Sequence, residues 1–244
     1  WGRGLEGPAD YPPLPSACTN HCAGLVPLKS GGAVIFVAGG LSKIEARSAA
    51  ALKNFWSLAL APNGLPVEGG EWEAVVAWPG AERFQAASGV VGDQFYVIGG
   101  LRLDEGKRIL PPLSDGYRYS LSGKKWERIA DLPRGVAAAP SPALRIGEAH
   151  LLLPGGGDPE ALGWAAANPG RSLGEHPGFS RECFAYHSVV DRWASYGASE
   201  FPDEELGTSR VTANTVEWEG RWFIPSGEAR PGVRSPKVFA VKAA

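Results

Sequence analysis

Paired glycines recur along this chain, and each pair closes a short apolar segment. The pairs are Gly39-Gly40, Gly99-Gly100 and Gly155-Gly156, and Ser226-Gly227 takes the fourth place. They recur at intervals of roughly 60 residues, and self-similarity at a fixed period of this order is the sequence signature of a repeat architecture. The chain is therefore interpreted as four equivalent supersecondary units.

The four units share one plan. Each has an apolar strand, a small turn, a second apolar strand that ends in the small pair, and a later strand that carries a tryptophan. Strands rich in β-branched and aromatic residues with Gly-rich turns at this spacing predict four-stranded propeller blades. We therefore expect an all-β chain of radially arranged antiparallel sheets, with the glycine-ended strands near the centre. Trp72, Trp126 and Trp193 are expected to play equivalent packing roles between neighbouring blades.

The composition fits a single domain that covers residues 1–244. The chain is 44% hydrophobic and 20% charged, which is enough for a substantial core, and a net charge of −2 indicates neither a nucleic-acid nor a membrane partner. It has no run of ~18 apolar residues and, as given, no charged-then-apolar leader. We expect a soluble protein, either cytoplasmic, periplasmic or secreted, and the sequence leaves its oligomeric state open.

The three cysteines carry little functional information. Cys18 and Cys22 flank His21, but the second ligand pair of a zinc finger is missing, and Cys183 is remote. We interpret the three as small buried thiols and predict no metal site.

Little of the sequence predicts helix. Residues 46–54 are the best helix former, and we interpret them as a short turn. Residues 158–180 form a long insertion rich in glycine and proline, of a kind that is usually functional or disordered. A second insertion, residues 101–114, is interpreted as a solvated charged hairpin. Tyr186 and His187 are expected to point outward from the third strand of a blade rather than to act as acid or base.

The fourth unit closes with a loop that sets a carboxylate, Glu228, beside two guanidinium groups, Arg230 and Arg234. Gly227 and Gly232 permit the positive φ values that such a loop requires. Side chains on a loop at the end of a strand are often catalytic, but a surface salt bridge on a turn is an equally good interpretation from these residues alone.

Several stretches resemble the kelch repeats, and more specifically the kelch-type N-acetylneuraminate epimerases, or sialic acid mutarotases, in their cyclically permuted branch. The most specific stretch is Gly-Glu-Ala-Arg-Pro-Gly-Val-Arg at residues 227–234, and others are FWSL at 55–58, WERIADLP at 126–133 and HPGFS at 176–180. The resemblance covers nearly the whole chain. It implies a kelch-type β-propeller from a six-bladed family that interconverts sialic acid anomers.

The resemblance also implies roles for particular residues. Glu228 matches the acid/base carboxylate of the family, and Arg234 matches its partner. As further candidates for substrate binding we assign Arg83, Gln85, Asn214 and Arg230. Arg230 is at the same time the control position, because we expect its alanine variant to be nearly silent. No cofactor or metal is expected.

Only four repeats are visible, although the family is six-bladed. The chain has no methionine and opens on Trp1, so we expect either the C-terminal four blades of a larger propeller or a four-repeat ring. In the ring, residues 1–15 would act as an outer strand and pair with residues 238–241. An open arc would leave exposed sheet edges, which natural proteins avoid.

The expected chemistry is acid/base ring opening of a small sugar acid. One carboxylate in a partly desolvated pore can remove the proton of the anomeric hydroxyl and return it, while a guanidinium fork holds the substrate carboxylate. The alternative is a non-catalytic kelch module that binds a protein or glycan. A Glu228 in the central pore beside Arg234 would favour the enzyme, and a Glu228 on the outer rim would favour the module.

Overall fold

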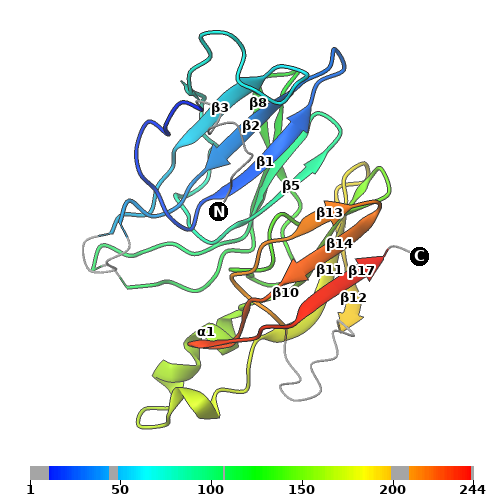
Figure 1. Cartoon of the computed structure of the whole chain (residues 1–244). Helices are drawn as coiled ribbons and strands as arrows, with labels where there is room; N and C mark the ends of the chain where they lie inside the picture. Colours follow the sequence, from blue (N-terminus) through cyan, green and yellow to red (C-terminus); the bar gives the residue numbers. More distant parts are fainter. Residues whose placement is uncertain (1–10, 44–48, 107, 199–208, 243–244) are drawn as a thin grey trace, which may run out of the picture.

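A computed structural model describes residues 11–43, 49–106, 108–198 and 209–242 and contains four antiparallel sheets in chain order (Figure 1). The first sheet is β1 (Cys22–Pro27), β2 (Ala33–Ala38), β3 (Phe55–Leu60) and β4 (Glu73–Ala74). The second is β5 (Ala87–Val91), β6 (Gln94–Ile98), β7 (Gly116–Ser120) and β8 (Lys125–Ile129). The third is β9 (Leu144–Ile146), β10 (His150–Gly156), β11 (Ser180–His187) and β12 (Arg192–Ala198). The fourth is β13 (Val216–Trp218), β14 (Arg221–Pro225) and β17 (Val238–Lys242), with a separate hairpin of β15 (Glu228–Arg230) and β16 (Val233–Arg234).

This arrangement is the predicted β-propeller, with one blade per repeat. The first strands of the blades lie at the centre: Ser88 on β5 donates its hydroxyl to Ala23 O on β1 and accepts from Ala143 N, which precedes β9. The first strands of all four blades line one central cavity of about 650 Å³. We expected the glycine-ended strands to lie at the centre. Each of them is instead the second strand of its sheet and pairs with the first strand, as seen for β2, β6, β10 and β14.

Aromatic side chains fill the space between the first two blades. Phe36 and Phe55 stack with their ring centroids 4.9 Å apart, and Tyr119 and Trp126 meet Phe55 edge-on from the second blade. Each of these rings buries a large apolar area, and the pairs contribute roughly 0.5–1.5 kcal/mol beyond that burial. This core holds the blades at a fixed angle to one another.

Each of the three repeat tryptophans donates an indole hydrogen bond to a backbone carbonyl of the segment that precedes its own unit. The indole N–H of Trp126 donates to Val76 O at 2.7 Å, and that of Trp193 donates to Ala130 O at 2.9 Å. Trp72 donates to Pro12 O at 2.9 Å. All three tryptophan side chains are half-buried. The acceptor residues Val76 and Ala130 each follow the outer strand of their blade, β4 and β8 respectively.

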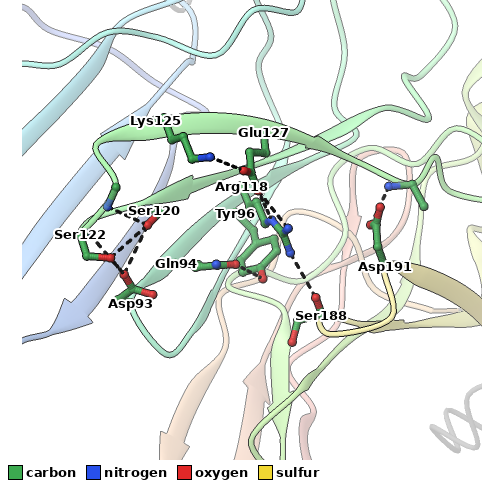
Figure 2. A network of polar contacts seen from close by, with 12 residues as sticks. Asp93, Gln94, Tyr96, Arg118, Ser120, Ser122, Lys125, Glu127, Ser188 and Asp191 are labelled. Carbon is green, nitrogen blue, oxygen red and sulfur yellow. Dashed lines mark hydrogen bonds and ion pairs between the residues drawn. The ribbon is translucent and has the colours of Figure 1, made fainter.

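Polar contacts tie the second blade to the third (Figure 2). Arg118 on β7 pairs with Glu127 at 2.9 Å and donates to Ser188 O in the third blade at 3.1 Å. Asp191 accepts from the backbone N–H of the second blade's Ala130 and from the hydroxyl of Tyr186, each at 2.8 Å. The expectation that Tyr186 points outward is wrong: its ring is fully buried between the two blades, and burial raises the pKa of its hydroxyl.

The long insertion contains the two helices of the described chain, where we had expected none. They are α1 (Pro159–Ala167) and the short 3₁₀ helix η1 (Leu173–Glu175). Asp158 caps α1 by accepting from Ala161 N at 2.7 Å, and a proline at the first helical position has a φ already suited to the helix. Residues 49–54, the described part of the segment interpreted as a short turn, form no helix, and Ala51 is bridged to Leu41.

The other insertion is the charged hairpin that we predicted. Leu103 and Ile109 pair across it, and Arg108 contacts Asp104 at 2.7 Å.

Of the three cysteines, Cys22 and Cys183 are buried as predicted, but Cys18 is only partly covered. Burial raises the pKa of the Cys22 thiol to about 12. Within the described ranges, no three His, Cys, Asp or Glu side chains gather as a metal site. None of the helices described is long and apolar enough to cross a membrane.

The predicted closure through the first fifteen residues is wrong for the part of that segment that is described. Tyr11 donates its hydroxyl to Gly64 O at 2.6 Å, so this segment lies against the loops of the first blade. β17 pairs with β14 and with no other described strand. Residues 1–10 lie outside the described residues.

Candidate functional site

Four residues with positive φ mark one place in the four repeats. They are Asn20, Gln85, Ala138 and Thr212, with φ values of 54°, 52°, 55° and 50°. Backbone hydrogen bonds of 2.8 Å join them in series, from Thr212 N to Ala138 O, from Ala138 N to Gln85 O and from Gln85 N to Asn20 O. We call these four residues the inner chain. Positive φ is unfavourable for residues other than glycine, so its recurrence shows that the scaffold imposes this geometry at the mouth of the propeller.

The residue that follows each small pair is fixed against the inner chain. In every repeat it pairs with the residue just before the inner-chain position, giving the bridges Thr19–Leu41, Phe84–Leu101, Ala137–Gly157 and Val211–Glu228. Leu41 and Leu101 are 8% and 2% exposed at this position. The scaffold therefore accommodates an apolar side chain or a glycine at this position. Folding does not require the carboxylate that Glu228 places there.

The hairpin of β15 and β16 orients this carboxylate. Pro231 and Gly232 form its turn, and Gly232 has a φ of +75°, which glycine adopts without strain. The backbone N–H of Gly232 donates a short hydrogen bond to Oε1 of Glu228. The hydroxyl of Thr212 lies 3.5 Å from Oε2, at the long limit for a hydrogen bond. Both carboxylate oxygens thus have a donor that fixes their direction.

Arg234 lies opposite Glu228 in the hairpin register, so the two side chains share one face. Its guanidinium is exposed, and Nη2 donates to Oγ1 of Thr212 at 3.3 Å. Among the residues that the structure describes, no ion pair within 4.0 Å joins Glu228 to either Arg230 or Arg234. The contact between the predicted catalytic pair runs through Thr212, which the sequence did not single out because its position depends on tertiary pairing.

A cavity of about 300 Å³ opens beside the carboxylate. One side is polar and carries Gln85, Thr212 and Glu228. The other side is largely apolar and is contributed by the long insertion. The full lining is Gln85, Ala138, Gly157, Ala161, Leu162, Ala165, Leu173, His176, Phe179, Val211, Thr212, Glu228 and Pro231. This volume is at the small end for ligand pockets and suits a monosaccharide.

Of the four residues assigned to substrate binding, Gln85 alone lines this cavity. Arg83 is 1% exposed and serves the scaffold: it pairs with Asp115 at 3.0 Å, donates to Gly99 O at 3.0 Å and lies over the rings of Trp78 and Tyr117. A side chain held in this way is not brought to the cavity, so the structure gives Arg83 a packing role instead.

Asn214 and Arg230 also lie outside the lining. Asn214 is exposed two residues beyond the inner chain, and its backbone bridges to Ser141. Arg230 ends β15 and donates to Gly174 O in η1 at 3.3 Å. Arg230 therefore ties the hairpin of β15 and β16 to the insertion that lines the cavity.

The arrangement offers one carboxylate for proton transfer beside the inner chain. Glu228 is the only acidic residue among those that line the cavity, and it is on the inner chain side rather than on the outer rim. A carboxylate with a free edge toward a small cavity can accept a proton from a bound hydroxyl and return it.

Comparisons with known proteins agree with the predicted resemblance. A Kelch motif matches residues 82–133. The chain is 26% identical over 187 residues to the N-acetylneuraminate epimerase of Salmonella paratyphi B, covering 69% of this chain and 46% of that protein. It is 24% identical over 191 residues to the N-acetylneuraminate epimerase of Haemophilus influenzae, covering 70% and 48%. The chain thus spans about half the length of the curated relatives it matches.

A solved structure confirms the fold. The structure titled "Structure of YjhT" superposes with a TM-score of 0.68 at 16% identity and covers 93% of this chain and 64% of that one. At this identity the likeness establishes the propeller architecture and no more.

Proposed function

We propose that this protein interconverts the anomers of N-acetylneuraminate or a related sugar acid, with Glu228 as the proton carrier. The observation that carries the proposal is the position of Glu228, where the other repeats have Leu41, Leu101 and Gly157. A carboxylate beside a monosaccharide-sized cavity, at a position where the other repeats have leucine or glycine, supports a chemical role. The similarity to proteins named N-acetylneuraminate epimerase supports the choice of substrate class.

The proposed reaction needs one base that works in both directions. Glu228 removes the proton of the anomeric hydroxyl while the bond between the anomeric carbon and the ring oxygen breaks, and it delivers the same proton to the former ring oxygen. The product is the open-chain keto acid. In the closing step Glu228 takes that proton back from the former ring oxygen as this oxygen attacks the other face of the carbonyl carbon, and it gives the proton to the carbonyl oxygen, which becomes the new anomeric hydroxyl. The donors from Gly232 and Thr212 keep the carboxylate in one orientation throughout.

Arg234 supplies the positive charge in this proposal. Arg234 is not among the residues that line the cavity, but its exposed guanidinium adjoins Thr212, which is one of them, and in this proposal it holds the substrate carboxylate with two parallel donors. Gln85, which precedes the second blade and lines the same cavity, binds a sugar hydroxyl in this proposal. Arg230, which contacts the insertion, is not given a direct role.

The experiment is NMR exchange between sialic acid anomers, measured against the spontaneous rate. Glu228→Gln keeps the shape and removes the base, so the catalysed rate should fall by about 10²–10⁴-fold while sugar binding changes little. Arg234→Lys should mainly weaken binding, because a point charge cannot replace the two-donor fork. Arg128→Ala, an exposed arginine that pairs with Asp131 and does not line the cavity, is the control and should be nearly silent.

The result that would overturn the proposal is a wild-type rate no higher than the spontaneous one. In that case the same cavity would be the binding site of a non-catalytic kelch module, and sugar binding without acceleration would be its signature.

A further inference from the structure

The long insertion of the third blade forms one whole side of the cavity. Ala161 and Ala165 on α1 are four residues apart and so lie on one face of the helix, and Leu162 adjoins them. Leu173 on η1 and Phe179, just before β11, complete this side. We call these five residues the insertion wall. Their side chains offer a ligand no hydrogen bond, in contrast to the polar side formed by Gln85, Thr212 and Glu228.

Polar contacts with two other segments, those of Arg134 and Arg230, hold the insertion in place. Asp158, the cap of α1, lies 3.5 Å from Arg134, which also pairs with Glu182 on β11 at 3.1 Å. At the other end, Arg230 of the catalytic hairpin donates to Gly174 O. These contacts link the wall directly to the hairpin that carries the carboxylate.

His176 joins the two ends of the insertion. It is 2% exposed, its Nε2 lies 2.9 Å from Ala161 O in α1, and its Nδ1 accepts from Gly178 N at 2.9 Å. Since Nδ1 is the acceptor, Nε2 carries the hydrogen that α1 accepts. The ring also contacts Trp164 and Phe179, with centroids 5.1 and 5.5 Å away. Both ring nitrogens are occupied within the insertion, so His176 positions the wall and does not move a proton.

We propose that the insertion wall determines specificity by receiving an apolar acyl substituent of the sugar acid, and that His176 is its positioning residue. This inference rests on the proposed function for the identity of the ligand. A sugar acid that reacts at Glu228 has its anomeric centre on the polar side, so a substituent elsewhere on the ring must face the wall. A methyl-bearing acetamido group can pack against that surface, whereas a hydroxyl at the same carbon would find no hydrogen-bond partner among the side chains of the insertion wall.

The test compares two sugar acids, N-acetylneuraminate and the analogue with a hydroxyl in place of its acetamido group. Ala165→Asp places a carboxylate on the wall, and Ala166→Asp, one residue further along α1 and outside the cavity lining, is the matched control. We expect wild type and Ala166→Asp to prefer the acetamido sugar by about tenfold in kcat/KM, and Ala165→Asp to lose that preference. His176→Ala should raise KM for the acetamido sugar more than it lowers kcat, and His176→Gln, whose amide can donate to Ala161 O, should restore part of the loss.

Binding separates failure of this inference from failure of the proposed function. Titrations of the Glu228→Gln protein with each sugar acid, followed by ligand-observed NMR, measure binding at the insertion wall in the absence of the reaction. A preference for the acetamido sugar that Ala165→Asp abolishes supports the wall even if no catalysis is found. Equal binding of the two sugars, undetectable binding of both, or equal effects of Ala165→Asp and Ala166→Asp overturn it.

Discussion

At the scale of single residues, the repeat provides its own internal comparison for Glu228. Leu41 and Leu101 occupy the equivalent place, so the scaffold tolerates leucine there. We expect Glu228→Leu to abolish activity while changing the free energy of unfolding by less than about 1 kcal/mol, as measured by urea denaturation. The reverse change at the equivalent place, Leu101→Glu, buries an unpaired carboxylate and should cost roughly 3 kcal/mol or more. A loss above about 2 kcal/mol for Glu228→Leu would mean that the carboxylate is structural.

The pair of Arg83 and Asp115 makes stability depend on pH. Burial alone would raise the pKa of Asp115, but the hydrogen bond and charge of Arg83, with the hydroxyl of Tyr117, hold it below its ordinary value. A carboxyl whose pKa is lower in the folded protein stabilises the fold above about pH 4 and loses that contribution as the pH falls through the folded pKa. We expect Asp115→Asn to cost roughly 3 kcal/mol at pH 6.

The check on this second prediction is the pH dependence of the difference. Urea midpoints of wild type and Asp115→Asn should converge as the pH falls from about 6 to below 3. A difference that stays constant over this range would show that Asp115 contributes through packing and not through its charge.

The role of a residue was predictable from the sequence only where that residue belongs to a recognisable motif. Glu228 and Arg234 stand in a distinctive run, and the structure places both on one face of a hairpin. Thr212 has no such motif, and its importance comes from a positive φ and from pairing with a residue sixteen positions later. Arg83 was assigned to the substrate because a sequence does not show that a buried aspartate and two rings already occupy its guanidinium.

At the scale of elements, the three repeat tryptophans should contribute equally. Replacement by phenylalanine keeps most of the ring and removes the indole donor to the preceding unit. We expect Trp72→Phe, Trp126→Phe and Trp193→Phe each to cost about 1–2 kcal/mol, because the side chains are only half-buried. Trp218→Phe, at a position 63% exposed, is the control and should change stability little. A spread above about 2 kcal/mol among the three, by thermal or urea unfolding, would contradict their equivalence.

The strands were predictable from the sequence, whereas α1 was not. For the strands the reason is steric. A Cβ at Gly99 would collide with Val136 O of the neighbouring unit. No other residue fits at this strand end, so the glycine that marks the repeat can be recognised in the sequence. Within the insertion the helix signal is an Asp-Pro start followed by alanines. That signal is short, and the surrounding glycines and prolines of residues 158–180 obscured it.

At the scale of the whole molecule, the fourth sheet has two unlike faces. Trp222, Ile224 and Phe239 are buried, and Trp222 donates to Arg145 O in the third blade at 3.0 Å. The opposite face, by register, carries Val216, Trp218 and Val238, which are 54%, 63% and 60% exposed. In the second blade the corresponding face holds Tyr96 and Ile98, which are buried against the third blade. The exposed face is therefore of the kind that this fold covers with another sheet.

An uncovered apolar sheet face promotes association, so we expect this chain on its own to self-associate at about 10–100 µM. The double variant Trp218→Ser, Val238→Ser should shift sedimentation-velocity profiles toward the monomer, because it makes that face polar. Ile109→Ser is the control, since Ile109 is equally exposed but stands alone on the charged hairpin of residues 101–114. If the wild-type chain is monomeric over this range, or if Ile109→Ser has the same effect as the double variant, the face does not drive association.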